Sequence, residues 1–492
     1  MTDRYILAID QGTTSSRAML FSDTGDIIDT AQKELPVQYP QKGWIEQSPD
    51  DIWNDTLWAC KTLADKYGAN NIAVAGITNQ RETTIIWDRK TGKPIYSAIV
   101  WQDRRTADLC SRLKEQGHED LIQSKTGLII DPYFSATKIA WILDNVDGAR
   151  SRAEAGELAF GTVDSFLLWH LTGGKEHATD ATNASRTMIY NIVDQCWDKD
   201  LLALLDIPAS LLPEIKDNIA DFGTIEPSLL GASITIGGMA GDQHAALIGQ
   251  ACFDKGMVKS TYGTGCFLLM NIGDTFKKSE NRLLTTMAYR INGKPTYATE
   301  GAIFVAGAAI QWLRDGLGIM DDAADSEDMA TSANPDHGIS FIPAFTGLGA
   351  PWWDPHARAA IMGLTRENTA NDIARAALEA QAFQTQDLMG AIKADTGYNP
   401  AIIRVDGGLV ANNFMCQFLA DILDKPVELP ENQETTAAGA AYLAAIQAGI
   451  YKDFDDISRK WKKHKGYSPN MEQSEREARY GLWQDNIRRV TA

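Results

Sequence analysis

Cysteine is scarce in this sequence, and acidic residues outnumber basic ones. The 492 residues include six cysteines, and no two of them form a Cys-x-x-Cys pair. Zinc knuckles and dithiol redox sites use such pairs, so neither is indicated, and we expect reduced, buried thiols in a cytoplasmic protein. Lys and Arg total 46 against 65 for Asp and Glu, which gives a net charge of −19. A generic nucleic-acid binder needs a basic surface, so that class is not expected.

Long hydrophobic runs are also missing. The longest apolar run, residues 301–310, is about half the length that a helix needs to cross a bilayer. The N-terminal residues show no signal-peptide pattern. The sequence therefore predicts no stable membrane insertion and a cytoplasmic location.

Three familiar site motifs are absent. The sequence has no Gly-x-x-x-x-Gly-Lys-[Ser/Thr] loop, no Gly-x-Gly-x-x-Gly after a strand, and no His-Glu-x-x-His. These absences argue against a Walker A loop, a Rossmann or protein-kinase glycine loop, and a zinc-protease helix. A phosphate ligand would have to be held by another device, such as hairpin tips with exposed amides and hydroxyls.

The order of expected elements indicates a duplicated α/β protein. Short β-rich segments at residues 5–10 and 17–21 enclose a polar turn, and strands then alternate with helix-spaced segments. A similar strand, turn and returning strand occupies residues 256–271. We therefore expect mixed sheets flanked by helices, in two similar domains that face each other across a cleft. The expected bounds are 1–250, 251–450 and a C-terminal tail, 451–492, whose residues Tyr480, Trp483, Ile487 and Val490 fit one face of a helix packing on the second domain.

Three polar turns are candidates for phosphate binding. They are Asp10-Gln-Gly-Thr-Thr-Ser-Ser-Arg17, Tyr262-Gly-Thr-Gly265 and Val405-Asp-Gly-Gly-Leu-Val-Ala-Asn-Asn413. Glycine lets the backbone approach a ligand, and a helix that starts near Asn412 would offer free amides. Each turn alone would fit an ordinary hairpin or strand-to-helix turn, but the three together favour nucleotide binding.

Two further polar segments follow expected strands. Asn79-Gln-Arg-Glu82 and Gly241-Asp-Gln-His244 carry groups that could bind the hydroxyls of a polyol. Asp242 is the candidate base, because in phosphoryl transfer it need only accept the proton of the attacking hydroxyl. Taken alone, Arg81 and Glu82 would also fit a surface ion pair, and His244 would fit a packed, hydrogen-bonded histidine.

These segments carry a resemblance to the FGGY carbohydrate kinases that extends from Ile6 to about Gly449. Its most specific stretches are residues 10–17, 78–82, 100–106, 241–243, 260–267, 406–408 and 411–413. The resemblance implies an actin-like fold of two ribonuclease-H-like domains. It also implies ATP- and Mg²⁺-dependent phosphorylation of glycerol to sn-glycerol 3-phosphate, the first step of glycerol catabolism, by a homodimer or homotetramer.

The same resemblance implies a role for individual residues. Asp242 would be the catalytic base, and Asp10 and Asp242 would hold Mg²⁺ through water. Glycerol would contact Arg81, Glu82, Trp101, Tyr133, Asp242, Gln243 and Phe267. ATP or ADP would contact Thr13, Thr14, Ser15, Arg17, Thr264, Gly307, Gln311, Gly408 and Asn412. Gly307 and Gln311 are four residues apart, so they would share one face of a helix expected from about Ile303.

Other functions stay open at this point. The chain could be a kinase of the same family for another polyol or for a ketose such as xylulose. It could also be an actin-like ATPase that is not a kinase, which would need the phosphate-binding turns but no polyol pocket. A non-catalytic sensor is disfavoured because both candidate catalytic carboxylates, Asp10 and Asp242, are present.

One departure from the family leads to a prediction about regulation. Some bacterial members carry a basic, glycine-rich loop before the Asp-Gln pair that binds fructose 1,6-bisphosphate. Here residues 223–241 contain no Lys or Arg. We therefore predict that fructose 1,6-bisphosphate does not inhibit the protein. Initial rates with and without millimolar inhibitor check this, and a clear drop in rate would contradict it.

Overall fold

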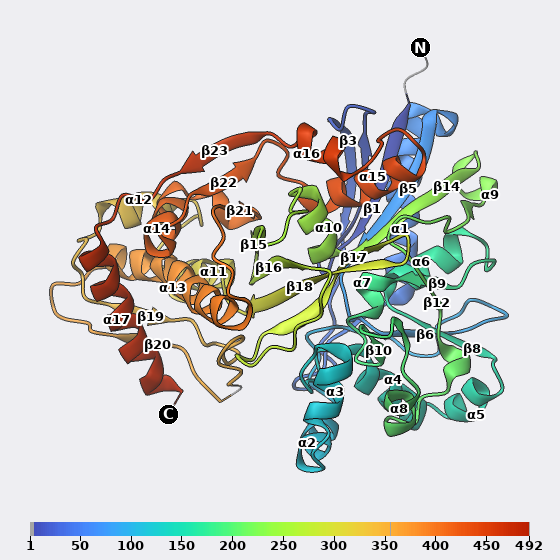
Figure 1. Ribbon diagram of the computed structural model, residues 1–492, viewed down its shortest axis with the longest axis horizontal. Helices are drawn as coiled ribbons and strands as arrows, with labels where there is room; N and C mark the ends of the chain where they lie inside the picture. The colour runs from blue at the N-terminus through green and yellow to red at the C-terminus, as the bar shows by residue number, and fades with distance from the viewer. Residues whose placement is uncertain (1–3, 355, 492) are drawn as a thin grey trace.

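The computed structural model describes residues 4–354 and 356–491. In Figure 1 the first half of the chain, in blue to green, lies on the right, and the second half, in yellow to red, extends to the left. Each half is built around one mixed β-sheet with helices packed against it. This arrangement confirms the expected α/β fold with two mixed sheets.

The first sheet has six strands in the order β13-β14-β5-β1-β2-β3. β1, β2 and β3 form an antiparallel meander, and β5 and β14 add to it in parallel. β1 and β5 are buried over nearly their whole length because apolar residues occupy both of their faces. The strands are β1 (Tyr5–Gln11), β2 (Ser15–Phe21), β3 (Ile27–Glu34), β5 (Ile72–Asn79), β13 (Thr224–Ile225) and β14 (Ile234–Gly241).

The second sheet repeats this plan. Its order is β17-β18-β16-β15-β21-β22-β23, and β15, β16 and β18 are antiparallel while β21 and β22 join in parallel. The β1–β2 and β15–β16 hairpins therefore occupy equivalent positions, as the repeated turns in the sequence indicate. The strands are β15 (Val258–Tyr262), β16 (Cys266–Gly273), β17 (Leu284–Ile291), β18 (Lys294–Ile303), β21 (Ile403–Asp406), β22 (Val427–Pro430) and β23 (Lys463–Tyr467).

Two helices lie between the sheets. α15 (Thr435–Gln447) packs on β1, β5 and β14, and α10 (Asp242–Gly249) packs on α15 and against β15, β16 and β17. Their side chains form one hydrophobic cluster with residues from both sheets. The two halves thus share part of their core, and α15, which belongs to the second half by sequence, covers the first sheet.

The outer faces of the sheets are covered by other helices. α1 (Pro49–Tyr67) packs on β2 and β3 of the first sheet, and α13 (Ala370–Thr396) packs on β16 and β18 of the second. The prediction that a helix starts at about Ile303 was wrong: β18 continues to Ile303, and α11 begins only at Gly307. The apolar run 301–310 is split in this way because its first residues are paired in the sheet.

The remaining elements surround these two layers. The helices are α2 (Ala107–Glu115), α3 (Glu119–Thr126), α4 (Ser135–Asn145), α5 (Ala149–Glu154), α6 (Val163–Leu171), α7 (Ala181–Ala184), α8 (Lys199–Leu204), α9 (Pro227–Leu230), α11 (Gly307–Asp315), α12 (Asp325–Ser332), α14 (Asn413–Leu423), α16 (Phe454–Lys460) and α17 (Gln473–Val490). Paired short strands are β4 (Glu46–Gln47) with β7 (Ala98–Ile99), β6 (Ile85–Asp88) with β8 (Leu158–Gly161), β9 (Ala178–Asp180) with β12 (Glu214–Lys216), β10 (Tyr190–Asn191) with β11 (Cys196–Trp197), and β19 (Ser340–Ile342) with β20 (Ala360–Met362).

The residues after 450 do not form one unit. α16 joins the cluster between the two sheets, and β23 extends the second sheet beside β22. In α17, Trp483 and Ile487 are buried, and the Trp483 indole donates a hydrogen bond to Asp387 of α13 at 2.9 Å. In the described part of the chain, no helix is both long enough and apolar enough to cross a membrane.

Candidate active site

Asp242 stands where β14 ends and α10 begins. The preceding residue, Gly241, donates its backbone N–H to Thr182 Oγ1 at 3.0 Å, which fixes the turn into the helix. A Cβ at Gly241 would lie 2.7 Å from Arg81 Cγ, so only glycine lets Arg81 pass beside the turn. The Asp242 side chain is 30% exposed. Burial raises the pKa of Asp242, although Arg81 favours its charged form.

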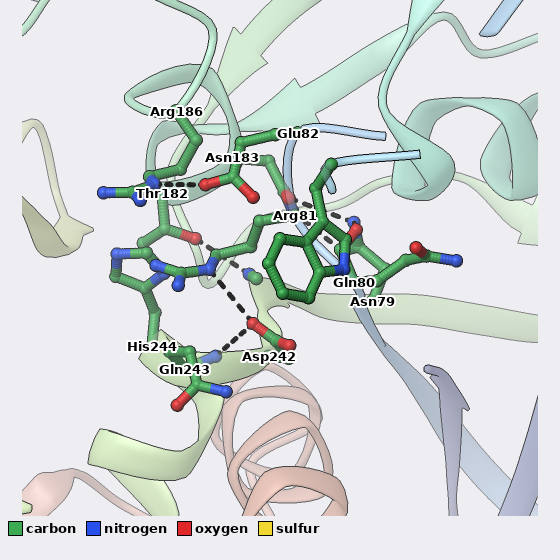
Figure 2. A network of polar contacts seen from close by, with 12 residues as sticks. Asn79, Gln80, Arg81, Glu82, Thr182, Asn183, Arg186, Asp242, Gln243 and His244 are labelled. Atoms are coloured by element: carbon green, nitrogen blue, oxygen red, sulfur yellow. Dashed lines mark hydrogen bonds and ion pairs between the residues drawn. The ribbon is translucent and has the colours of Figure 1, made fainter. Parts of the chain in front are cut away.

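Arg81, at the end of β5, is the central cation of the site (Figure 2). It is buried, and its Nε lies 3.1 Å from Asp242 Oδ1. Its two terminal nitrogens donate to both carboxylate oxygens of Glu300, at 2.7 and 3.1 Å. Arg81 Nη2 also reaches Tyr133 OH at 3.4 Å. The guanidinium is therefore held between the buried carboxylate of Glu300 and the partly exposed carboxylate of Asp242.

Glu82 does not pair with its neighbour Arg81, and a surface ion pair between the two is excluded because both are buried. Instead Arg186 Nε donates to Glu82 Oε1 at 2.6 Å. Glu82 has a φ of 59°, a left-handed conformation that a non-glycine residue rarely adopts. Hydroxyls of Ser135 and Thr84 donate to its carbonyl oxygen at 3.0 and 3.1 Å, so the unusual backbone is held from two sides. Burial raises the pKa of Glu82 even though Arg186 lies beside it.

Three aromatic side chains lie next to these charged groups. The ring of Trp101 meets the rings of Tyr133 and Phe267 edge to face, with centroids 5.5 and 6.1 Å apart. The Arg81 guanidinium lies 5.7 Å from the centre of the Phe267 ring. Phe267 comes from β16, so residues of both halves meet here. The arrangement places apolar surface beside hydrogen-bonding groups, which suits a ligand with both C–H and O–H groups.

Gln243 follows Asp242 in the first turn of α10. Its backbone N–H donates to Asp242 Oδ1 at 2.6 Å. Its side-chain oxygen accepts a hydrogen bond from Lys259 Nζ, and Lys259 also donates to Thr261 Oγ1 at 2.9 Å. Lys259 is buried on β15, and burial lowers its pKa. In this structure the Gln243 side chain is thus engaged by the second half of the chain.

The first hairpin tip adjoins this group of residues. The Trp101 indole donates to Thr13 Oγ1 at 2.9 Å, which joins the tip to the aromatic side chains. Arg17 forms an ion pair with Asp10 through the carboxylate oxygen Oδ2, and a second one with Glu434 at 2.7 Å. Thr14 is exposed and Ser15 is partly exposed. Thr13 therefore contacts the aromatic side chains, and its neighbours Thr14 and Ser15 remain accessible.

In the second half, the structure brings several predicted nucleotide residues together. The carbonyls of Gly263 and Thr264 accept the backbone N–H groups of Gly307 and Ala306, at 2.9 and 2.8 Å. A Cβ at Gly407, next to Gly408, would lie 2.5 Å from the Tyr262 carbonyl oxygen. Three turns thus meet at the second hairpin tip.

Gln311 and Asn412 are placed differently from each other. Gln311 is exposed, one turn after Gly307 in α11. Asn412 is buried and caps α14 by accepting the Met415 N–H at 2.9 Å. Its side-chain nitrogen donates to Ser326 Oγ at 3.1 Å. Gln311 is free to reach a ligand, whereas Asn412 is used structurally.

The chain matches models of a known protein family over most of its length. The model of the N-terminal domain of the FGGY family of carbohydrate kinases matches residues 5–249, and the model of its C-terminal domain matches residues 258–448. The chain belongs to the FGGY family of carbohydrate kinases.

Several members of the FGGY family resemble the chain over nearly its full length. A protein of Nitrosomonas eutropha named glycerol kinase is 61% identical over 97% of this chain and 96% of its own. A second glycerol kinase, from Alcanivorax borkumensis, is 57% identical over 99% and 98%. The crystal structure of Plasmodium falciparum glycerol kinase with ADP superposes with a TM-score of 0.93, at 35% identity, covering 99% of this chain and 98% of that one.

Three charged residues of this site are not among those predicted from the sequence. Arg186 and Glu300 are completely buried and pair with Glu82 and Arg81, and Lys259 is buried against Gln243. The available signal was a charged residue in or beside a segment that is expected to be buried, since an ion in such a place needs a partner. Lys259 lies in the expected strand 256–262, and Glu300 directly precedes the apolar run 301–310.

Proposed function

We propose that the chain is a glycerol kinase, which transfers the terminal phosphoryl group of ATP to glycerol and forms sn-glycerol 3-phosphate. The observation that carries this proposal is the 61% identity to a named glycerol kinase over 97% of the chain. The proposal is further supported by the polar groups of Arg81 and Asp242 beside the rings of Trp101, Tyr133 and Phe267, which suit a ligand with both O–H and C–H groups.

Asp242 is the proposed catalytic base. It is the partly exposed carboxylate of the site, and Arg81 holds one of its oxygens at 3.1 Å. Asp242 would accept the proton of the attacking hydroxyl as the oxygen bonds to phosphorus. Arg81, Glu82, Tyr133 and Gln243 would orient the glycerol hydroxyls, and Trp101 and Phe267 would cover its carbon atoms.

The nucleotide would lie between the two hairpin tips. Thr13, Thr14, Ser15 and Arg17 would contact the transferred phosphoryl group from the first half of the chain. Contacts to ATP or ADP from the second half would come from Thr264, Gly307, Gln311, Gly408 and Asn412. Because Asn412 is engaged by Met415 and Ser326, its contact with a nucleotide would leave the α14 cap in place and involve only its remaining polar capacity.

The residues present fit a magnesium ion that is bound together with phosphate. No group of three or more potential metal ligands occurs in the described ranges, but Mg²⁺ commonly uses only one or two carboxylates, together with phosphate oxygens and water. Asp10 lies at the end of a buried strand, and Arg17 contacts only its Oδ2. Asp10 and Asp242 would hold the ion, which would supply positive charge to the phosphates.

We further propose a homodimer or homotetramer in the cytoplasm. The oligomeric state is what the resemblance to the family implies. The location is inferred from the sequence, and six free cysteines suit a reducing compartment. Size-exclusion chromatography with light scattering would measure the assembly.

A substrate panel tests the proposed function. The chain should be assayed with glycerol, xylulose and gluconate, with ATP, with and without Mg²⁺, and with ADP formation as the readout. We expect the highest kcat/KM for glycerol and little turnover without Mg²⁺. A pentulose that reacts many-fold faster would support a ketose kinase instead. ATP turnover that is independent of every acceptor would support a non-kinase ATPase.

A further inference from the structure

We propose that Glu300, a residue of the second half, is the positioning residue for Arg81 in the acceptor site. The inference rests on the proposed function, because it concerns how glycerol is held. Glu300 lies in β18, opposite Leu269 of β16 and Leu284 of β17. It is fully buried, so its charge exists there only because cations face it.

The geometry of the contact is what assigns this role. Glu300 binds Arg81 with both oxygens, at 2.7 and 3.1 Å, which fixes the plane of the guanidinium as well as its position. With two of its nitrogens held in this way, Arg81 presents Nε to Asp242 and Nη2 to Tyr133. The orientation of Arg81, which is proposed to bind the substrate, is therefore set by β18 of the second half of the chain.

Arg186 extends this arrangement to Glu82. Arg186 Nη2 donates to Glu300 Oε1 at 3.1 Å, and its Nε donates to Glu82. Burial alone would raise the pKa of Glu300, but Arg186 and Arg81 outweigh it and hold the pKa below its ordinary value. The Glu300 carboxylate thus anchors two arginines, Arg81 and Arg186. They contact Asp242 and Glu82, which are both proposed to bind glycerol.

Two substitutions separate positioning from charge balance. Glu300→Gln keeps the shape of the side chain and removes its charge, whereas Glu300→Asp keeps the charge and withdraws the carboxylate by one methylene. We expect both to raise the KM for glycerol, by about 10- to 100-fold for the first variant. We expect the KM for ATP to stay within about two-fold, because Glu300 contacts no proposed nucleotide residue.

Asp217→Asn is the matched control. Asp217 also joins the two halves, through Arg290 at 2.5 Å and the Gly293 N–H at 2.8 Å, and it has no contact with the site. The Asp217→Asn variant should have the wild-type KM for glycerol and for ATP. Binding of glycerol without nucleotide, followed by tryptophan fluorescence because Trp101 lies in the site, gives a second readout.

The outcomes distinguish the possibilities. A Glu300→Asp variant with the wild-type KM for glycerol would show that only charge balance matters and would overturn the inference. Equal increases in the KM for glycerol and for ATP would also overturn it, and so would a loss of thermal stability with unchanged glycerol affinity. Wild-type protein that does not phosphorylate glycerol would instead overturn the proposed function.

Discussion

Replacement of Asp242 by asparagine is expected to lower kcat for glycerol phosphorylation by about 10²- to 10⁴-fold. The amide fills the same space but cannot accept the proton of the attacking hydroxyl. The fold should survive, because Arg81 keeps its two hydrogen bonds to the buried Glu300 and is not left as an unpaired buried cation. We expect the free energy of unfolding to change by no more than about 1 kcal/mol.

The pH dependence gives an independent check of this role. Burial raises the pKa of Asp242, so the group takes up its proton at a higher pH than an ordinary aspartate does. Because a base works only when ionised, kcat/KM should fall as the pH decreases through that raised pKa. The acid limb of the profile should therefore lie above the range of a free aspartate.

The loss of kcat and the shift of the acid limb can be measured with the same two variants of Asp242. Profiles of kcat/KM for the wild type, Asp242→Asn and Asp242→Glu, with a stability measurement at each pH, separate loss of the base from unfolding. The glutamate variant should keep an acid limb at a reduced rate, and the asparagine variant should lose the limb that this group produces. An asparagine variant with the wild-type kcat would contradict the assignment of Asp242 as the base.

The hairpins could be predicted from the sequence because their signals are local. A strand, a turn rich in glycine and hydroxyls, and a returning strand are all contained within about fifteen residues at residues 5–21 and 256–271. The structure has hairpins at both places, β1–β2 and β15–β16, in equivalent positions of the two sheets. The same holds for the start of α14, where Asn412 caps the helix.

The charge network of the site could not be predicted in the same way. Arg81 and Glu300 are separated by 219 positions, and Glu82 and Arg186 by 104. The Arg81–Glu300 pair depends on how the second sheet packs against the first half, and the Glu82–Arg186 pair depends on how two distant segments of the first half fold together. No local pattern reports either arrangement. The sequence placed Arg81 beside Glu82 in the chain, but the positive φ of Glu82 directs its side chain to Arg186 instead.

The start of α11 shows a different limit. An apolar run is compatible with a buried strand or a buried helix, and residues 301–310 contain both. Pairing with β16 holds the chain in the sheet up to Ile303, and the contacts of Gly307 with the second hairpin tip fix where the helix begins. Tertiary contacts decided this boundary, and the sequence periodicity did not.

The second large effect is expected at the crossing of α10 and α15. A Cβ at Gly439 would lie 1.9 Å from the backbone oxygen of Ala245, and a Cβ at Gly249 would lie 1.9 Å from that of Thr435. The helices therefore touch backbone to backbone. A side chain at Gly439 must push them apart, because a backbone atom cannot turn aside as a flexible side chain can.

We expect Gly439→Ala to destabilise the protein by about 2–3 kcal/mol. In an open helix the same change would stabilise it, because glycine costs up to about 1 kcal/mol relative to alanine there. Gly481 in α17 provides this control, since nothing lies within 4 Å of its missing Cβ. Unfolding in urea should therefore give opposite signs for Gly439→Ala and Gly481→Ala.

The crossing also connects stability with activity. α10 begins at Asp242, so a displaced α10 would move the proposed base, and a shift of about 1 Å can cost 10²-fold in rate. Gly439→Ala should therefore lower kcat/KM for glycerol even at temperatures where the variant is fully folded, and Gly481→Ala should not. A Gly439→Ala protein with the wild-type stability and rate would mean that the helices can separate without moving Asp242, and that the close crossing does not position the base.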